Sequence, residues 1–376
     1  MGSLPSSSRL SRRQDEDSPQ YRVYASFSAK RASPGVNISN WIECYNPLTN
    51  EWRRVTSIPG LVENHIMKGF AMVIVEDFIY VIGGLLCYKD ILIEGGHDNS
   101  SDGPSEIDQE VTQSVLRYSI RDETWLKCSS LNVPRFDFAC SVHGSKIYVS
   151  GGKSKPNSVR GVSSSEIYDP ALDEWKLLPN MSTSRYKCVG VTWQDRIYVV
   201  GGFAEYECET NDNNHGPFSM ARSSAEVFDT VNNKWDFLPR MWDLDIPPNQ
   251  IVDVGGKLFS SGDCYKKWKG FIEKFDRELN MWNVVDGSSL SSPTSMLDVT
   301  SPKRPLMEQL YLTIAPIGTS LYFLAGYRMN GEETSNFRSE VHVFKTYEGV
   351  WTSFEPMLED VEKELSCHCA VYKGRI

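Results

Sequence analysis

Short runs in which apolar residues alternate with small or polar ones recur along this chain. The clearest stretch extends from Phe138 to Trp175 and contains such runs at 138–142, 146–150 and 165–168, separated by glycines. Alternating runs rich in β-branched and aromatic residues, bounded by glycine and proline, predict β-strands. The stretch therefore predicts a four-stranded sheet whose fourth strand begins near Trp175. Such a sheet needs neighbouring sheets to bury both of its faces.

Copies of this unit are marked by an aromatic residue that lies seven positions before a tryptophan. The six pairs are Tyr45/Trp52, Tyr118/Trp125, Tyr168/Trp175, Phe228/Trp235, Phe275/Trp282 and Phe344/Trp351. Successive tryptophans are 47 to 73 residues apart. Strand-rich repeats of about 50 residues are typical of β-propellers. We expect both rings of each pair to be structural and to bury large areas between stacked sheets.

A hydrophobic run that ends in small residues precedes five of the six pairs. In three repeats the run ends in a glycine pair: Gly83 and Gly84, Gly151 and Gly152, Gly201 and Gly202. Gly-Asp and Ala-Gly replace the pair in the last two repeats. Glycine permits a backbone turn with positive φ, so these residues are interpreted as structural.

This combination of a glycine pair with an aromatic residue and a tryptophan at fixed separation resembles the kelch repeat. The resemblance covers residues 21–376 and implies an all-β, six-bladed propeller. The chain resembles the kelch half of plant F-box/kelch-repeat proteins, without an F-box. Residues 1–20 are too few for an F-box or BTB module and are interpreted as a disordered polar tail.

Ring closure is predicted to join the two ends of the chain. The run Tyr21–Ser28 matches a second strand, and Cys367–Tyr372 matches the missing innermost strand of the same sheet. The predicted blades are 21–58 plus 366–376, 67–131, 136–180, 186–240, 249–286 and 310–357. Closing the ring in this way removes exposed strand edges.

Composition narrows the possible partners. The chain has 39 Lys and Arg against 49 Asp and Glu, a net charge of −10, which argues against non-specific nucleic-acid binding. It has no apolar run of membrane-spanning length, so no membrane segment is expected. The nine cysteines show no disulfide or metal spacing. They fit a reducing compartment, so we expect the protein in the cytoplasm or nucleus. We expect it to be a monomer.

One rim of the propeller is expected to be the working face. Two long acidic inserts, 85–113 and 203–222, fall between the second and third strands of their blades and are interpreted as solvated loops. The connections between blades emerge on the same rim. Variation concentrated on one rim of a regular scaffold indicates a binding surface.

Polar and aromatic candidates for binding fall at this rim. Six lie where the connections between blades reach the channel mouth: His65, Arg135, Arg185, Tyr186, Lys187 and Asn249. The two arginines either bind a carboxylate or acidic peptide, or form bridges to carboxylates of neighbouring blades. Trp268, flanked by three lysines, is either a binding anchor or packs on its own blade.

No catalytic or metal motif emerges from the sequence, so no cofactor is expected. The histidines lack ligand spacing, and no nucleophile elbow or phosphate loop is present. The leading hypothesis is therefore an intracellular protein-interaction module that binds a protein partner on this rim. The alternative is an enzyme or small-molecule binder of plant metabolism with its pocket at the channel mouth, because propellers also host enzymes.

Overall fold

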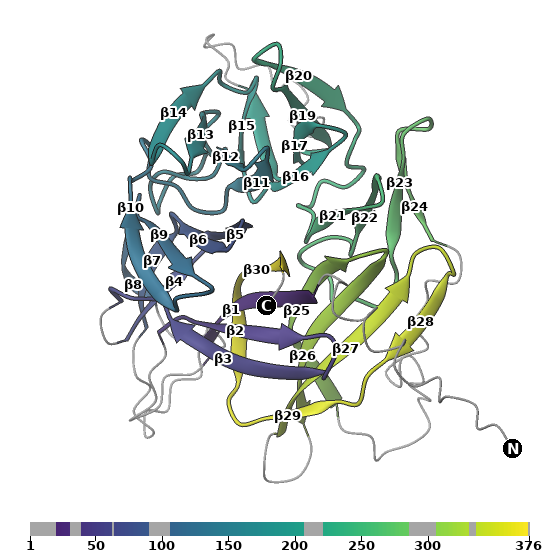
Figure 1. Ribbon diagram of the computed structural model, residues 1–376. Coiled ribbons are helices and arrows are strands. Elements are labelled where there is room, and N and C mark those ends of the chain that lie inside the picture. The colour runs from purple at the N-terminus through teal and green to yellow at the C-terminus, as the bar shows by residue number, and fades with distance from the viewer. Residues whose placement is uncertain are drawn as a thin grey trace, which may run out of the picture.

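The computed structural model describes residues 20–30, 39–61, 64–89, 106–206, 221–285, 306–330 and 336–374. Strands make up nearly all of their regular structure, in six antiparallel sheets of four strands or more and two smaller sheets. The larger sheets follow one another around a ring (Figure 1). We number them blades 1 to 6 in the chain order of their tryptophans. The predicted all-β propeller fold is confirmed, whereas the blade count and the blade boundaries stay predictions.

The first three blades each have four strands, which run in order from the innermost to the outermost. Blade 1 is β30 (Lys363–Gly374), β1 (Gln20–Ala29), β2 (Trp41–Asn46) and β3 (Glu51–Ser57). Blade 2 is β5 (Ala71–Val75), β6 (Phe78–Ile82), β9 (Val115–Ser119) and β10 (Thr124–Cys128). Blade 3 is β11 (Ala139–His143), β12 (Lys146–Ser150), β13 (Ser165–Asp169) and β14 (Glu174–Leu178).

The other three blades follow the same order. Blade 4 is β16 (Val189–Trp193), β17 (Arg196–Val200), β19 (Ser224–Asp229) and β20 (Lys234–Pro239). Blade 5 is β21 (Ile251–Val254), β22 (Lys257–Ser260), β23 (Glu273–Asp276) and β24 (Met281–Val284). Blade 6 is β25 (Leu306–Ile317), β26 (Ser320–Asn330), β27 (Asn336–Lys345) and β28 (Val350–Ser353), with β29 (Met357–Glu359) also paired to β27.

The constant spacing of the aromatic–tryptophan pairs follows from a repeated hairpin. In each blade the aromatic residue on the third strand lies directly opposite the tryptophan on the fourth, as Tyr168 does with Trp175. The ring centroids are 4.9 to 5.3 Å apart in the six pairs. A hairpin of fixed length and a close aromatic contact therefore explain the seven-residue spacing.

The two rings of a pair differ in burial, although both pack on the hydrophobic core. The first ring of each pair is buried. The tryptophans are only partly buried, because they lie on the outermost strand of the blade, whose other residues mostly face solvent. This holds for all six: Trp52, Trp125, Trp175, Trp235, Trp282 and Trp351. The pairs remain structural, but only their tyrosine or phenylalanine is buried.

Four of these tryptophans tie their blade to the preceding one. The indole Nε1 of Trp125 donates to Thr56 Oγ1 of blade 1 at 3.0 Å. The Nε1 groups of the next three donate to backbone carbonyl oxygens just after the preceding blade's fourth strand: Trp175 to Ser129, Trp235 to Pro179 and Trp282 to Met241, at 2.7 to 2.9 Å. In these four blades the partly exposed indole therefore links neighbouring blades through its N–H group.

The two ends of the chain meet in blade 1. Strand β30 pairs antiparallel with β1, with Val371 opposite Val23. The prediction that a C-terminal strand completes the first blade is confirmed. The innermost strand of each blade contacts that of the next, and β30 closes the circle between β25 and β5. The hydrophobic core lies between the blades, and Trp52 packs there with its ring 5.7 Å from that of Phe27 of β1.

The glycine pairs end the second strand of a blade. Gly152 has a φ of +88°, and an added Cβ there would lie 2.7 Å from the carbonyl oxygen of Phe136. Blade 6 has Ala325-Gly326 instead, and Gly326 lies within a strand that continues to Asn330. Without the turn-forming pair, the second strand of this blade runs on past the point where the others end.

The first acidic insert begins with a strand and has another near its end, and the second insert begins with a strand, so these parts are not loops. β7 (Leu85–Lys89) and β8 (Glu106–Val111) form a small sheet with β4 (His65–Lys68), and β18 (Phe203–Tyr206) pairs with β15 (Thr183–Tyr186). Leu85 and Cys87 are buried, which gives the first of these strands a core to pack on. Residues 90–105 and 207–220 lie outside the described residues.

The two ends of the ring differ in their connections. At one end, two residues link the first and second strands, as between Val75 and Phe78, and four link the third and fourth, as between Asp169 and Glu174. At the other end lie the connections between blades and the loops between second and third strands, which differ in length from blade to blade. We call this second end the variable rim. The turns at the first end are short and uniform in length, and a smaller cavity of about 330 Å³ lies among those of blades 2 and 3.

Candidate functional site

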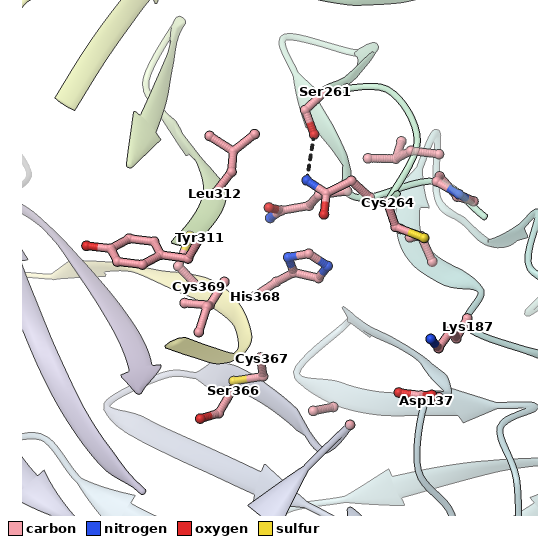
Figure 2. A pocket seen from close by; sticks show the side chains of 18 of the residues that line it. Asp137, Lys187, Ser261, Cys264, Tyr311, Leu312, Ser366, Cys367, His368 and Cys369 are labelled. Carbon is pink, nitrogen blue, oxygen red and sulfur yellow. Dashed lines mark hydrogen bonds between the residues drawn. The ribbon is translucent and has the colours of Figure 1, made fainter. Parts of the chain in front are cut away.

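A cavity of about 680 Å³ opens at the variable rim, around the axis of the ring. Its wall includes residues from the innermost strands of all six blades, with Ala71, Cys140, Gly190, Ile251, Leu312 and His368 as examples. Figure 2 shows His368 near the middle of this space, with Lys187, Asp137 and Cys264 on one side and Tyr311 on the other. Its volume is in the range of small-molecule and peptide pockets.

Three of the seven residues predicted to bind a partner line this cavity: Lys187, Asn249 and Trp268. Asn249 donates from Nδ2 to Ser261 Oγ at 3.0 Å, which fixes its amide beside the cavity. Tyr186 and His65 lie in the small rim sheets rather than in the cavity wall. His65 packs against Tyr88, with ring centroids 5.4 Å apart.

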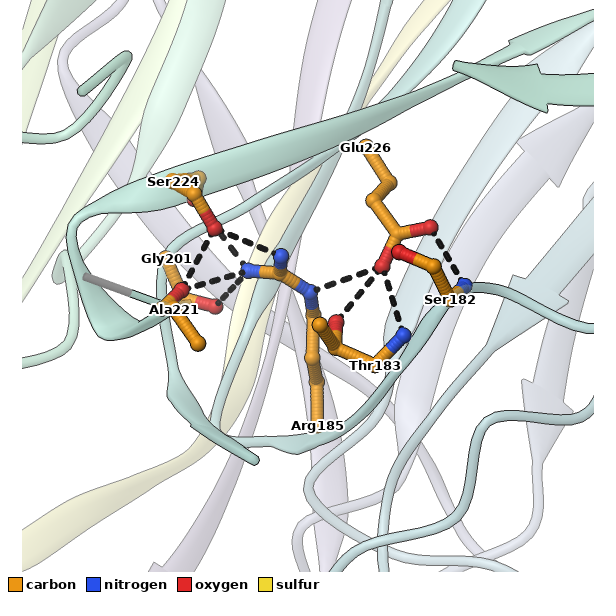
Figure 3. Close-up of polar contacts among 7 residues, drawn as sticks. All are labelled: Ser182, Thr183, Arg185, Gly201, Ala221, Ser224 and Glu226. Atoms are coloured by element: carbon orange, nitrogen blue, oxygen red, sulfur yellow. Dashed lines mark hydrogen bonds and ion pairs between the residues drawn. The ribbon is translucent and has the colours of Figure 1, made fainter. Parts of the chain in front are cut away.

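Arg185 is fully buried inside blade 4 and does not reach the cavity. Its Nη2 donates to Ser224 Oγ at 2.7 Å and its Nη1 to the carbonyl oxygen of Gly201 at 3.1 Å, while Nε lies 3.5 Å from Glu226 Oε1 (Figure 3). Glu226 in turn accepts hydrogen bonds from the backbone amides of Ser182 and Thr183. The pair therefore ties the incoming connection, which is the segment that leads from blade 3 into blade 4, to the second and third strands of blade 4.

Arg135 repeats this arrangement in blade 3. Its Nη2 donates to Glu166 Oε1 at 2.7 Å, and its Nη1 donates to the carbonyl oxygens of Gly151 and Ser164. Both side chains of the ion pair are fully buried. Burial lowers the pKa of Arg135, and Glu166 opposes that shift. The geometry fits the structural interpretation of the arginines, with one correction: each carboxylate belongs to the arginine's own blade, not to a neighbour.

The carboxylates of these pairs were missed from the sequence, although they carry a signal. Glu166 and Glu226 each lie two residues before the aromatic residue of their repeat, in SEIYD and SAEVFD. Glu43 and Glu273 have the same position in blades 1 and 5. Glu43 accepts from Lys363 at 2.7 Å. In blades 1, 3 and 4 the glutamate at this position of the repeat therefore pairs with a buried cation.

Trp268 packs on the next blade rather than its own. Its ring is stacked on Phe323 of β26, with centroids 4.6 Å apart and planes 5° from parallel. Trp351 of β28 lies 6.0 Å away, and Trp268 Nε1 donates to the carbonyl oxygen of Phe271. The side chain thus joins blades 5 and 6, with one edge in the cavity wall.

Lysines rest on aromatic rings along one sector of the variable rim. Lys153 Nζ lies 4.1 Å from the centroid of Tyr186, and Lys187 Nζ lies 5.8 Å from that of Tyr265. Tyr186 also packs on Phe203 at 5.0 Å. Tyr265 is 62% exposed. These contacts join blades 3, 4 and 5, and they leave ammonium donors and one aromatic face open to a ligand.

The ionisable groups in the cavity are largely neutral or paired. His368 projects into the cavity, and its side chain is exposed there. The enclosing wall desolvates the imidazole and lowers its pKa to about 4. Burial raises the pKa of the Cys140 thiol and of the Cys369 thiol to about 12. Burial also raises the pKa of Asp137, against the opposing effect of Lys187 and Lys153. Protonated thiols and a neutral imidazole suit hydrogen bonding rather than nucleophilic attack.

Within the part of the chain that the structure describes, no group of three or more His, Cys, Asp or Glu side chains is placed to hold a metal ion. No helix among the same residues is long and apolar enough to cross a membrane.

Comparisons with known proteins agree with this architecture. A family model described as the kelch motif matches residues 34–59, 134–182 and 184–241. An F-box/kelch-repeat protein of Arabidopsis thaliana is 25% identical over 81% of this chain and 70% of its own length. A second one is 28% identical over 62% of this chain and 52% of its own. Kelch-like protein 36 of Bos taurus is 20% identical over 87% of this chain.

The chain spans about half the length of several of these relatives, 52% of the second and 46% of the third. The ring of antiparallel sheets defines a β-propeller, a repeat protein built from blades. Within that class, the motif match and these relatives support a kelch-repeat family.

Proposed function

We propose that this chain is a protein-interaction module that binds a partner protein on the variable rim, over the axial cavity. The observation that carries the proposal is the contrast between the two ends of the ring. The larger cavity, of about 680 Å³, and the loops of differing length lie at one end. Exposed, shaped and varied surfaces on a rigid scaffold are where binding is expected. The relatives named F-box/kelch-repeat proteins suggest a role as a substrate-recognition subunit.

Tyr265 offers a direct test, because an exposed aromatic beside a cavity is a typical binding anchor. Tyr347 is its matched control: it is 69% exposed, lies under Lys257 at 5.5 Å, and follows the third strand of blade 6 at the opposite end of the ring. Tagged wild type, Tyr265→Ala and Tyr347→Ala are each recovered from native cells and their partners quantified by mass spectrometry. We expect at least one protein to be lost with Tyr265→Ala and kept with Tyr347→Ala. Equal recovery with all three would overturn the proposal.

The proposed site of action is the cytoplasm or nucleus. All eight cysteines in the described ranges are free thiols, which is consistent with a reducing compartment. Imaging a fluorescent fusion in native cells tests this, and secretion of the fusion would contradict it.

A further inference from the structure

The variable rim carries a local excess of positive charge on a protein of net charge −10. The part of this rim that spans blades 3 to 5 holds Lys153, Lys155, Arg160, Lys187, Lys266, Lys267 and Lys269. The described carboxylates beside them are Asp137, Asp263 and Glu273, and Glu364 also lines the cavity. In the described part of the blade-4 loop, Arg222 lies over the ring of Phe203 at 5.3 Å. We use the name basic sector for three of these lysines, Lys153, Lys187 and Lys266.

Two of these three lysines are held by aromatic rings rather than by carboxylates. Among the described residues, neither Lys153 nor Lys187 has a carboxylate oxygen within 4.0 Å; they lie instead over the rings of Tyr186 and Tyr265. A ring occupies one side of an ammonium group and leaves the remaining N–H donors available. Lys187 is exposed and its backbone has a φ of +53°, so local geometry holds the residue at the cavity mouth.

Carboxylates near these lysines compensate them only in part. Asp137 lies near both Lys153 and Lys187, and burial disfavours its charged form. Asp263 pairs with Lys266 at 3.1 Å and also accepts from the backbone amides of Tyr265 and Lys266. Both of its carboxylate oxygens therefore already have partners other than Lys153 and Lys187. An anion that approached Lys153 and Lys187 would therefore meet two positive charges without a direct ion partner.

Polar groups that carry no net charge continue inward from the basic sector. The cavity wall offers the amide of Asn249, the hydroxyls of Ser261 and Ser366, and the neutral imidazole of His368. Such groups satisfy the hydrogen bonds of a peptide backbone without a charge penalty. Tyr265 supplies an exposed aromatic face beside them.

We propose that the basic sector binds a carboxylate-rich segment of the partner protein, with acidic side chains on Lys153 and Lys187 and the adjoining backbone over the cavity. This inference rests on the proposed function and specifies the chemistry of the partner. Ammonium–carboxylate hydrogen bonds are charge-assisted and stronger than neutral ones. A long polyanion such as a nucleic acid is disfavoured, because the rest of the molecule is acidic.

Fluorescence anisotropy with a labelled hexaglutamate peptide tests the inference, with labelled hexaglutamine as the neutral counterpart. We expect the wild type to bind hexaglutamate at least tenfold more tightly than hexaglutamine, and less tightly as salt is raised. The variant Lys153→Gln/Lys187→Gln should lose at least fivefold in affinity for hexaglutamate. Lys257→Gln, which removes an exposed lysine over Tyr347 at the opposite end, should change nothing.

The outcomes separate this inference from the proposed function. Equal affinity for the two peptides, no binding of either, or full affinity in the double variant would overturn the acidic specificity. If a partner is nevertheless lost with Tyr265→Ala, binding at the rim stands and only its chemistry is wrong. Free glutarate at equal carboxylate concentration is the final arm: full displacement of hexaglutamate would identify the ligand as a small acid and contradict a peptide segment.

Discussion

The guanidinium of Arg135 lies 2.7 Å from the carboxylate of Glu166, and both side chains are fully buried. Two charges removed from water in this way stabilise a fold only as a pair, because either one alone is left uncompensated. The same arrangement recurs in blade 4 with Arg185 and Glu226. These two pairs hold the incoming connections of blades 3 and 4 in place. They therefore support the variable rim from inside the protein.

Removing one member of this pair is expected to destabilise the protein strongly. Arg135→Met should lower the free energy of unfolding by about 3–5 kcal/mol, because Glu166 would remain buried without its cation. Urea denaturation followed by tryptophan fluorescence measures this. The double variant Arg135→Met/Glu166→Gln should lose less than the sum of its single variants. Strict additivity would mean that the two groups are not coupled.

Trp268 is expected to contribute to stability through its contact with blade 6. Trp268→Ala removes the stacked ring on Phe323 and should cost about 1–3 kcal/mol, less than for a fully buried tryptophan because part of the side chain is exposed. Tyr347→Ala, at a side chain that is 69% exposed, is the control and should leave the denaturation midpoint unchanged. A midpoint for Trp268→Ala that equals the wild type would refute the packing role.

Asp137 is expected to weaken the fold at neutral pH. Its folded-state pKa is raised above 3.8, so folding favours the protonated carboxyl, and the cost of ionising it is complete only above that raised pKa. Asp137→Asn should therefore stabilise the protein at pH 7, and asparagine also tolerates the φ of +53° found there. The gain should shrink as the pH falls through the folded pKa towards 3.8.

Thermal unfolding of the wild type and Asp137→Asn from pH 4 to pH 7 checks this sign. The same variant should bind hexaglutamate more tightly, because it removes a negative charge beside Lys187 and Lys153. A destabilised variant at pH 7 would show that Asp137 acts mainly as an ion partner of these lysines.

His368 is expected to make stability fall under mildly acidic conditions. Its folded pKa of about 4 lies below the ordinary value of 6.5, so between these values the unfolded chain binds the proton more readily. Stability should rise with pH across this window, and His368→Gln should flatten that part of the profile. An NMR titration of the imidazole measures the pKa directly, and a value near 6.5 would contradict the account.

The fold was largely predictable because its signal is local and periodic. The seven-residue spacing of Tyr168 and Trp175 reflects a single hairpin, and five further copies identify the repeat. Closure through β30 followed from the one strand that blade 1 lacked. The partial exposure of the tryptophans agrees with their place on the fourth strand, which is the outermost strand of each blade. The strands of the inserts were less apparent, because Leu85–Lys89 pairs with residues that precede blade 2 in the chain.

The site was predictable only in its location. Arg135 and Glu166 are 31 positions apart, and Arg135 is brought to blade 3 by the bridge between Phe136 and Lys153, which the sequence does not indicate. The contacts of Lys153 with Tyr186 and of Lys187 with Tyr265 depend on loop conformations from three different blades. Trp268 packs on the following blade, which the motif of three lysines around it does not indicate.

The central claim, a partner bound on the variable rim, is tested most directly by photo-crosslinking. Benzoylphenylalanine replaces Tyr265 in one variant and Tyr347 in another, two side chains of similar exposure at opposite ends of the ring. After irradiation in native cells, the account predicts a covalent adduct of defined mass at position 265 and none at position 347. An adduct at position 347 alone would place the partner on the uniform end and contradict the account.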